Sequence, residues 1–417
     1  MAIIREVKAR QILNSAGEPA VEVKVILENE KVFVGSAPAG ISRGSREATE
    51  VTDKDFARFQ GREMKNAVEK INEVVRPEIK GTNPIEQGLI DRKLIDLDGT
   101  PNKAHLGVNA ILPVSIAVAK AGAFNAKKHL FHHLNSYFND LIVEEGDFEV
   151  GVTNYPYQLP LPIFNMLEGG KHAQNSVPIQ EFWFVPQGTI GNNFWEKLRI
   201  GAEAFFYLRQ LLQGKNLNTN YGEEGGFAPS LNSIEQGLEL LIEAGIKTRA
   251  KPGVDFLLGI DAAGAQLAVE DQSQYYQDLV KKYPLRLLED PFGENDWERW
   301  INFHRNILEE VVVIGDDLTV TNPTLVAQAI RYQAISGLII KPNQIGTVTE
   351  VLRVAKLAKT KGLKLIVSHR SKETNDDFIA DLAVAVGADY IKSGAPVRGE
   401  RVAKYNRLLE IDSLVVK

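Results

Sequence analysis

The chain has 417 residues, enough for two or three domains of roughly 100–200 residues each. Its 48 basic and 54 acidic side chains give a formal net charge of −6, and this acidic excess argues against a nucleic-acid partner or an anionic membrane surface. Cysteine is absent, which excludes disulfides, zinc–thiolate sites, iron–sulfur clusters and thiol nucleophiles.

The first part of the chain is typical of a small α+β domain. Apolar residues alternate over 21–26 and cluster over 31–34, on either side of the polar tip 28–30, and this pattern predicts a β-hairpin. A loop rich in glycine and serine, residues 40–45, follows the hairpin.

Three helices are predicted after this loop, over residues 55–75, 83–97 and 109–128. The second has Asn83 as its cap and Pro84 at its first helical position. The third is rich in alanine and valine, so we expect a mostly buried helix that starts or kinks near Pro113. The polar segment 137–158 holds the predicted domain boundary, which divides the chain into residues 1–137 and 138–417.

Six short apolar runs recur in the second part, each ending at a charged or imidazole side chain and followed by a helical pattern. The residues at these six ends are Asp261, Glu289, Asp316, Lys341, His369 and Lys392. Their spacings of 28, 27, 25, 28 and 23 residues match the length of one strand–helix unit. Two further runs, 159–167 and 179–186, supply the missing strands. Residues 159–417 number 259, close to the about 250 of a (β/α)8 barrel.

A doubly wound sheet would also alternate strands and helices, but it would carry a glycine-rich phosphate turn. Neither GxGxxG nor GxxxxGK[ST] occurs in the chain. The pattern therefore favours a barrel, in which catalytic groups lie at the C-terminal ends of the strands.

Three carboxylates follow three successive predicted strands: Asp261, Glu289 and Asp316. Neighbouring strands lie about 4.8 Å apart, so we expect these groups to converge above the barrel. Unpaired carboxylates at such a distance repel and raise one another's pKa values, and a divalent cation removes that repulsion. An all-oxygen set of ligands suits Mg²⁺ best. The spacing alone does not distinguish Asp316 from its neighbour Asp317.

Two lysines and an anion-binding cluster end the later strands. A partly desolvated lysine beside a metal has a lowered pKa, so Lys341 or Lys392 is a candidate base. His369, Arg370 and Ser371 combine groups that bind a phosphate or a carboxylate.

Two glutamates upstream complete the candidate groups. Glu224 belongs to the glycine-flanked acidic pair of residues 222–226, and Glu181 lies within an apolar run, where its burial requires a partner. A metal site, a lysine base, a carboxylic acid and an anion clamp together suit removal of a proton α to a carboxylate.

Longer motifs resemble the enolase family (phosphopyruvate hydratase) over nearly the whole chain, from Ala9 to Asn406. The most specific motifs are GEEGGFAP at 222–229, LEDPF at 288–292, GDDLTVTNP at 315–323, IKPNQIGT at 340–347 and SHRSKE at 368–373. The resemblance implies a C-terminal (β/α)8-type TIM barrel of the enolase variant with a smaller N-terminal α+β capping domain. It also implies Mg²⁺-dependent, reversible dehydration of 2-phosphoglycerate to phosphoenolpyruvate in glycolysis and gluconeogenesis.

The resemblance also assigns the metal ligands, with two Mg²⁺ ions expected per active site. Asp261, Glu289 and Asp316 would bind the structure-fixing ion, and the first acid of the GDDL motif is the ligand, which favours Asp316 over Asp317. Ser42, on a mobile loop, would complete the second, catalytic site.

The remaining roles follow from the same resemblance. Lys341 would remove the α proton, and Glu224 would help the hydroxyl leave as water, assisted by Glu181. The other substrate contacts are His172 on a second closing loop, His369 near the leaving hydroxyl, Arg370 and Ser371 at the phosphate, and Lys392 at the substrate carboxylate.

Some loop residues depart from the family pattern: Ala16, Ile41, Arg43 and Pro113. Arg43 lies beside Ser42 and adds a charge to a closing loop, so a divergent lyase acting on another hydroxy or phosphorylated acid is an alternative. A catalytically weak binding protein with the same scaffold is a second alternative.

The expected partners are a small-molecule substrate and further copies of the chain, as a dimer or an octamer. No direct nucleic-acid contact is expected. The first residues hold too short an apolar run for a signal peptide, and no uncharged apolar stretch approaches the ~20 residues of a spanning helix. We therefore expect a cytoplasmic protein without membrane insertion.

Overall fold

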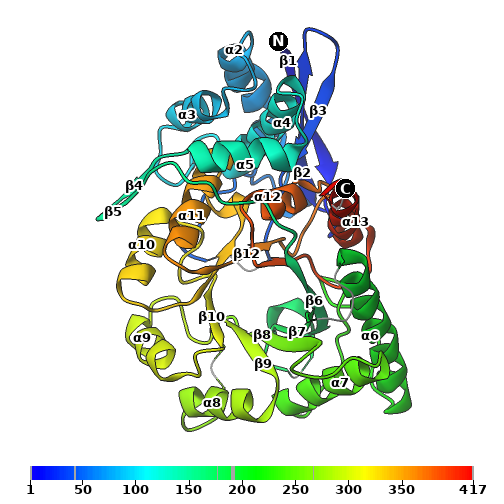
Figure 1. Cartoon of the computed structure of the whole chain (residues 1–417). Coiled ribbons are helices and arrows are strands. Elements are labelled where there is room, and N and C mark those ends of the chain that lie inside the picture. Colours follow the sequence, from blue (N-terminus) through cyan, green and yellow to red (C-terminus); the bar gives the residue numbers. More distant parts are fainter. Residues whose placement is uncertain (1, 42–43, 176, 189–192, 266, 416–417) are drawn as a thin grey trace.

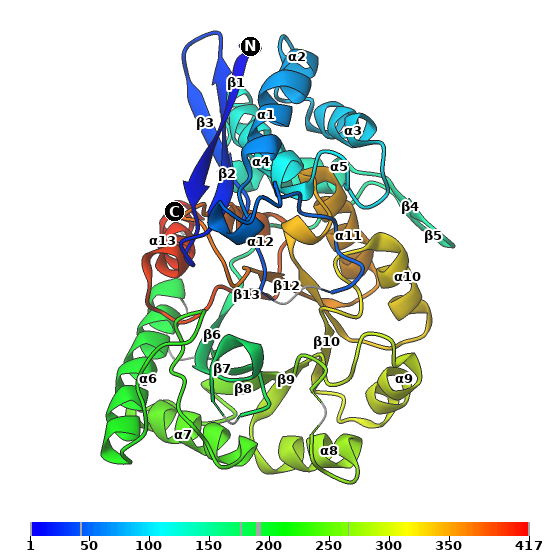
Figure 2. The ribbon, with the colours of Figure 1, turned by 180° about the vertical axis from the view of Figure 1, so that it is seen from behind.

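A smaller N-terminal domain lies against one end of an eight-stranded barrel (Figure 1). This arrangement is given by a computed structural model that describes residues 2–41, 44–175, 177–188, 193–265 and 267–415. From the opposite side, Figure 2 shows the chain that follows the N-terminal sheet passing over the barrel end near β12.

The N-terminal sheet has three antiparallel strands, β1 (Ile4–Leu13), β2 (Pro19–Leu27) and β3 (Val32–Ser36), in that order. Burial alternates along β2, where Val21, Val23 and Val25 face the core, so the predicted hairpin is confirmed. Strand β1 has a less regular pattern and was not predicted.

The buried face of this sheet packs on α4 (Val108–Asn125), the predicted alanine- and valine-rich helix. By length and composition α4 could cross a membrane, but most of it is buried in the N-terminal core. Pro113 lies within the helix.

The prediction of a helix over residues 55–75 is wrong for the first half of that range. The chain there forms a short 3₁₀ turn, η1 (Phe59–Gly61), then α1 (Lys65–Lys70), the π-helical η2 (Ile71–Val75) and α2 (Arg76–Ile79). Lys54, Phe59 and Gln60 have φ values of 58°, 45° and 53°, and this left-handed backbone interrupts a helix.

The second predicted helix begins one turn later than expected, as α3 (Gln87–Asp98) with Glu86 at its N-cap. The side chain of Asn83 accepts a hydrogen bond from the backbone N–H of Ile85 instead. Helix α5 (Leu130–Asp140) and the hairpin of β4 (Val143–Glu145) and β5 (Phe148–Val150) lead to the barrel. Residue 137, the proposed domain boundary, falls within α5.

The barrel closes in the order β10-β11-β12-β13-β6-β7-β8-β9. Its strands are β6 (Leu161–Glu168), β7 (Glu181–Pro186), β8 (Phe256–Asp261), β9 (Leu285–Glu289), β10 (Val312–Gly315), β11 (Gly337–Ile340), β12 (Lys364–Ser368) and β13 (Tyr390–Lys392). The six later strands end at or directly before the residues singled out in the sequence, and the predicted fold class is confirmed.

The first strands depart from a simple strand–helix repeat. Strand β7 runs antiparallel to both β6 and β8, and among the described residues between β6 and β7 the only regular element is the turn η3 (Gly170–His172). Two helices, α6 (Phe194–Gly214) and α7 (Ile234–Lys247), then lead into β8. This pairing places the ends of β6 and the start of β7 at the same end of the barrel.

The outer helices follow the later strands one by one: α8 (Gln272–Lys282), α9 (Trp297–Asn306), α10 (Pro323–Arg331), α11 (Val348–Thr360), α12 (Phe378–Ala385) and α13 (Gly399–Val415), with the turn η4 (Pro342–Gln344) before α11. Asn322 caps α10 ahead of Pro323 at the first helical position. Inside the barrel, Trp183 packs with apolar residues of the other strands, so the interior is filled by side chains.

A buried carboxylate joins the two domains. Asp91 on α3 accepts hydrogen bonds from Gln87 and Ser115 at 3.0 and 2.6 Å, and from the backbone and hydroxyl of Thr349 on α11 at 2.9 and 2.6 Å. The Asp91 side chain is fully buried, so its removal would leave these donors without an acceptor and without access to water.

We therefore expect Asp91→Ala to lower the free energy of unfolding by about 3 kcal/mol, because several buried donors lose their acceptor. Urea unfolding measures the change. Asp96→Ala on the exposed face of the same helix is the control, and equal midpoints for the two variants would contradict this role of Asp91.

Candidate active site

Four neighbouring strands carry a carboxylate at the same level of the barrel. Glu168 pairs with Glu181, Glu181 with Asp261, and Asp261 with Glu289 in the strand register. All four side chains are almost completely buried. We call these four residues the acid row. Buried carboxylates this close cannot all stay ionised without cations among them.

One lysine forms ion pairs with three of the four residues in the acid row. Lys392 reaches in from β13, and its Nζ atom lies 3.3 Å from Glu181, 3.6 Å from Asp261 and 2.9 Å from Glu289. The ammonium also lies 4.7 Å from the centre of the Trp183 ring. Burial lowers the pKa of Lys392, but the carboxylates outweigh it and hold that pKa well above its usual range.

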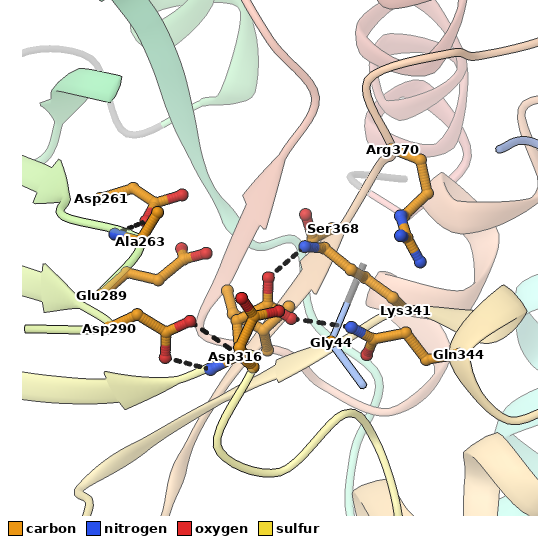
Figure 3. A network of polar contacts seen from close by, with 12 residues as sticks. Gly44, Asp261, Ala263, Glu289, Asp290, Asp316, Lys341, Gln344, Ser368 and Arg370 are labelled. Carbon is orange, nitrogen blue, oxygen red and sulfur yellow. Dashed lines mark hydrogen bonds and ion pairs between the residues drawn. The ribbon is translucent and has the colours of Figure 1, made fainter. Parts of the chain in front are cut away.

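Asp316 forms the next part of the site, directly after β10 (Figure 3). Its carboxylate binds the ammonium of Lys341 and accepts a hydrogen bond from Gln344 at 2.9 Å. Figure 3 shows Asp261 and Glu289 extending toward Asp316 and Lys341. The three predicted metal ligands and the two lysines therefore lie at the same barrel end, although Asp261, Glu289 and Asp316 do not form a group whose oxygens all lie within 4.8 Å of one another.

The carboxylates at this end of the barrel carry more negative charge than Lys341 and Lys392 can neutralise. Burial and the neighbouring charge of Asp261 raise the pKa of Glu289 well above its usual range. Burial and the charge of Asp316 raise the pKa of Asp317 to about 7. Burial raises the pKa of Asp316, but Lys341 and Lys392 outweigh it, so that pKa is lowered.

The structure does not show the lowered lysine pKa that the sequence predicted for a base. Burial lowers the pKa of Lys341, but its ion pair with Asp316 outweighs burial and the pKa is raised. The sequence prediction assumed a cation beside the lysine. In the structure the excess carboxylate charge acts on Lys341 instead.

Asp290 holds the backbone of this segment. Its two oxygens accept the N–H groups of Asp316 and Asp317 at 2.9 and 2.8 Å (Figure 3). One carboxylate oxygen from each of these three residues lies within 4.8 Å of the others, which makes them a second possible group of metal ligands. Since both oxygens of Asp290 accept N–H groups of the segment after β10, Asp290 positions the backbone that carries Asp316. The sequence prediction missed Asp290.

A second cluster contains the candidate acids and two histidines. One ligand atom from each of His172, Glu181 and Glu224 lies within 4.8 Å of the others. The Nε2 atom of His369 lies 3.1 Å from a Glu224 oxygen. Burial, with repulsion from Glu224, raises the pKa of Glu181 to about 8. Burial raises the pKa of Glu224, but His369 and His172 outweigh it and that pKa is lowered.

A fully buried arginine that the sequence prediction missed fixes His369. Arg401 on α13 donates to the Nδ1 atom of His369 at 2.6 Å and to the carbonyl oxygen of Arg370 at 2.6 Å. Since Nδ1 accepts this bond, the ring proton lies on Nε2 and faces Glu224. Burial lowers the pKa of His369 to about 4, so the ring is neutral at neutral pH.

Arg370, which the sequence predicts as part of an anion clamp, contacts a carboxylate from the N-terminal domain. Arg370 donates to the two oxygens of Glu47 at 2.7 and 3.2 Å and to the side-chain oxygen of Asn343 at 2.9 Å. The hydroxyl of Ser371 lies 3.3 Å from the Nε2 atom of His172. The sequence prediction missed Glu47, which fixes the orientation of the guanidinium. Ser42 and Arg43 lie outside the described residues.

The donor set suits a divalent cation. Asp261, Glu289 and Asp316 offer only carboxylate oxygens, which Mg²⁺ prefers. In the part of the chain that the structure describes, the Nδ1 atom of His172 and the Oε1 atom of Gln180 are buried without a hydrogen-bond partner. Buried polar atoms of this kind indicate a site built to hold further groups.

Two family models match the chain. The model of the enolase N-terminal domain matches residues 4–134, and the model of the enolase C-terminal TIM barrel domain matches residues 156–275 and 263–416. Together the matches cover the N-terminal sheet and helices and the whole barrel. Proteins of this family usually bind Mg²⁺, which agrees with the possible acidic metal-binding group of Asp290, Asp316 and Asp317 at this barrel end.

We therefore expect Mg²⁺ to stabilise the folded protein, because it offsets the repulsion among the buried carboxylates. At a hundredfold excess over its dissociation constant, a bound ligand adds about 2.7 kcal/mol to the free energy of unfolding. Thermal unfolding with Mg²⁺, and again with EDTA, measures this gain.

Glu289→Gln should abolish this stabilisation, while Glu298→Gln, an exposed acid on α9, should keep it. A gain of the same size in both variants would show that Mg²⁺ binds elsewhere.

Proposed function

Because the chain belongs to the enolase family, we propose that it catalyses the Mg²⁺-dependent, reversible dehydration of 2-phosphoglycerate to phosphoenolpyruvate. Members of the wider superfamily are typically lyases. One observation carries the proposal: two lysines form ion pairs with buried carboxylates at one barrel end. Lys392 pairs with Glu289 of the acid row, and Lys341 pairs with Asp316. A lysine base beside carboxylic acids suits removal of a proton α to a carboxylate.

In the proposed reaction, the Nζ atom of Lys341, in its uncharged form, takes the proton from C2 of the substrate. The electron pair of the broken C–H bond moves into the substrate carboxylate and gives an ene-diolate. The pair then returns to form the double bond, and the C3 hydroxyl leaves with a proton from Glu224 or Glu181 as water. When bound, Mg²⁺ supplies positive charge that offsets the negative charge of the ene-diolate.

The protonation states support this division of roles. Glu181, with a pKa of about 8, holds a proton at neutral pH, and it lies in one cluster with Glu224, whose lowered pKa leaves that carboxylate ionised. Lys341 must release its proton to act as a base, and its partner Asp316 opposes that release. Any positive charge placed beside Asp316 lowers the pKa of Lys341 and makes the base available.

The substrate's two anionic groups have separate binding residues. We assign the phosphate to Arg370 and Ser371, since Glu47 and Asn343 already hold the guanidinium in one orientation. We assign the substrate carboxylate to Lys392, which lies beside the acid row. His369, neutral and fixed by Arg401, lies next to Glu224, where the hydroxyl leaves.

The direct test mixes the purified protein with 2-phosphoglycerate and follows the ultraviolet absorbance of the enol product, first with Mg²⁺ and then with EDTA. The proposal predicts product that EDTA abolishes. A folded protein that binds Mg²⁺ but forms no product would contradict the substrate assignment and direct the search to other acids with an abstractable α proton.

Lys341→Ala should lower the exchange of the substrate's α proton with solvent by about 10³-fold, as expected when a general base is lost. Its stabilisation by Mg²⁺ should remain, because no metal ligand is removed. Proton NMR in deuterium oxide measures the exchange, and Lys281→Ala on exposed α8 is the control. Near-normal exchange in Lys341→Ala would mean that another group is the base.

A further inference from the structure

One member of the acid row has no role in the reaction proposed above. Glu168 ends β6, pairs with Glu181 in the strand register, and is 1% exposed. Unlike its three neighbours in the row, it has no ion pair with Lys392, and no described cationic side chain forms one with it. An anion buried at this depth needs donors of another kind.

Those donors come from the backbone of the loop that carries Glu224, residues 222–226. Both oxygens of Glu168 lie 3.1 Å from the N–H of Glu224, and one accepts the N–H of Gly226 at 2.6 Å. The loop approaches closely: a Cβ atom on Gly222 would lie 2.3 Å from an oxygen of Glu168. Three of the five loop residues therefore contact one carboxylate.

Other contacts hold the loop as well: the N–H of Glu223 donates to the carbonyl of His172 at 3.2 Å, and the carbonyls of Gly222 and Glu224 accept from Arg398 at 3.0 Å and from the N–H of Ala395 at 3.1 Å. Glu168 differs from these contacts because it accepts the N–H groups of both Glu224 and Gly226.

The ends of the loop are joined by a hydrogen bond of 2.8 Å from the N–H of Gly222 to the carbonyl of Gly226, and Gly225 has a φ of 93° that favours glycine. The Glu224 side chain then reaches Asn165 at 3.2 Å and His369 at 3.1 Å. A shift of the loop would move this carboxylate relative to the imidazole.

We propose that Glu168 is a positioning residue: its carboxylate anchors loop 222–226 and so aims Glu224 at the leaving hydroxyl. The part of this inference that concerns the leaving hydroxyl rests on the proposed function, but the anchoring of the loop by Glu168 does not depend on the substrate. A misplacement of about 1 Å in a catalytic group can cost about 10²-fold in rate.

The ionisable side chains nearest to Glu168 are also carboxylic acids. Glu224 faces it from the loop and Glu181 from β7, and with burial they raise its pKa, while the backbone N–H groups act in the opposite direction. Whether ionised or neutral, Glu168 offers an acceptor oxygen to the loop. Glutamine keeps that oxygen and the shape, so Glu168→Gln should preserve much of the anchoring that Glu168→Ala removes.

The first test measures hydrogen–deuterium exchange of the amides in residues 220–228. In Glu168→Ala the amides of Glu224 and Gly226 should exchange about tenfold faster, because they lose their acceptor. Glu168→Gln should lie between this variant and the wild type. The control is Asp255→Ala, which removes another buried carboxylate that binds a loop N–H, that of Lys251, before β8. It should leave 220–228 unchanged, and unchanged exchange in Glu168→Ala would overturn the proposal.

The second test separates proton removal from loss of water. In Glu168→Ala, dehydration of 2-phosphoglycerate should fall about 10²-fold with little change in KM, while α-proton exchange by Lys341 should stay within about threefold of the wild type. Equal losses in both steps would indicate a structural role only and would overturn the positioning role.

The two tests fail in different ways. If the wild-type protein neither exchanges the α proton nor forms product, the proposed function fails, yet the amide exchange still decides whether Glu168 anchors the loop. If the wild type is active and Glu168→Ala dehydrates normally, the inference fails and the proposed function stands.

Discussion

The barrel end is built around more buried negative charge than its own lysines can neutralise. Strands β6 to β9 bring four carboxylates to one level, and Lys392 contacts three of them. Lys341 likewise forms an ion pair with Asp316. The pKa values of both lysines are thereby raised, and burial with neighbouring carboxylates raises those of Glu168, Glu289 and Asp317, a charge balance that a bound cation would change.

The N-terminal domain is part of this site as well as a cover for it. Glu47, from the segment after the N-terminal sheet, holds Arg370 through both of its oxygens. Asp91 connects α3 to α11 on the other side of the domain interface. The orientation of the Arg370 guanidinium therefore depends on its contact with the N-terminal domain.

The sequence predicted the barrel, and it placed most of the candidate site residues at one barrel end, because each later strand is a short buried run that ends at or directly before a charged or imidazole side chain. Glu168 was missed because β6 and β7 form an antiparallel pair without an intervening helix, so the strand–helix spacing does not apply to them. Arg401 and Glu47 were missed because they act on other side chains from distant helices and loops. The helix expected over 55–75 was wrong because positive φ angles, which no pattern of apolar residues reveals, interrupt it.

The central claim is that the excess carboxylate charge forms a cation site and that this cation frees Lys341. A crystal structure with Mg²⁺ and 2-phosphoglycerate tests it most directly. The account predicts an ion about 2.0–2.1 Å from oxygens of Asp261, Glu289 and Asp316, with the Lys341 ammonium no longer bound to Asp316 and turned toward C2 of the substrate. An ion bound by Asp290 and Asp317 instead, or a Lys341–Asp316 pair that persists beside the bound substrate, would contradict it.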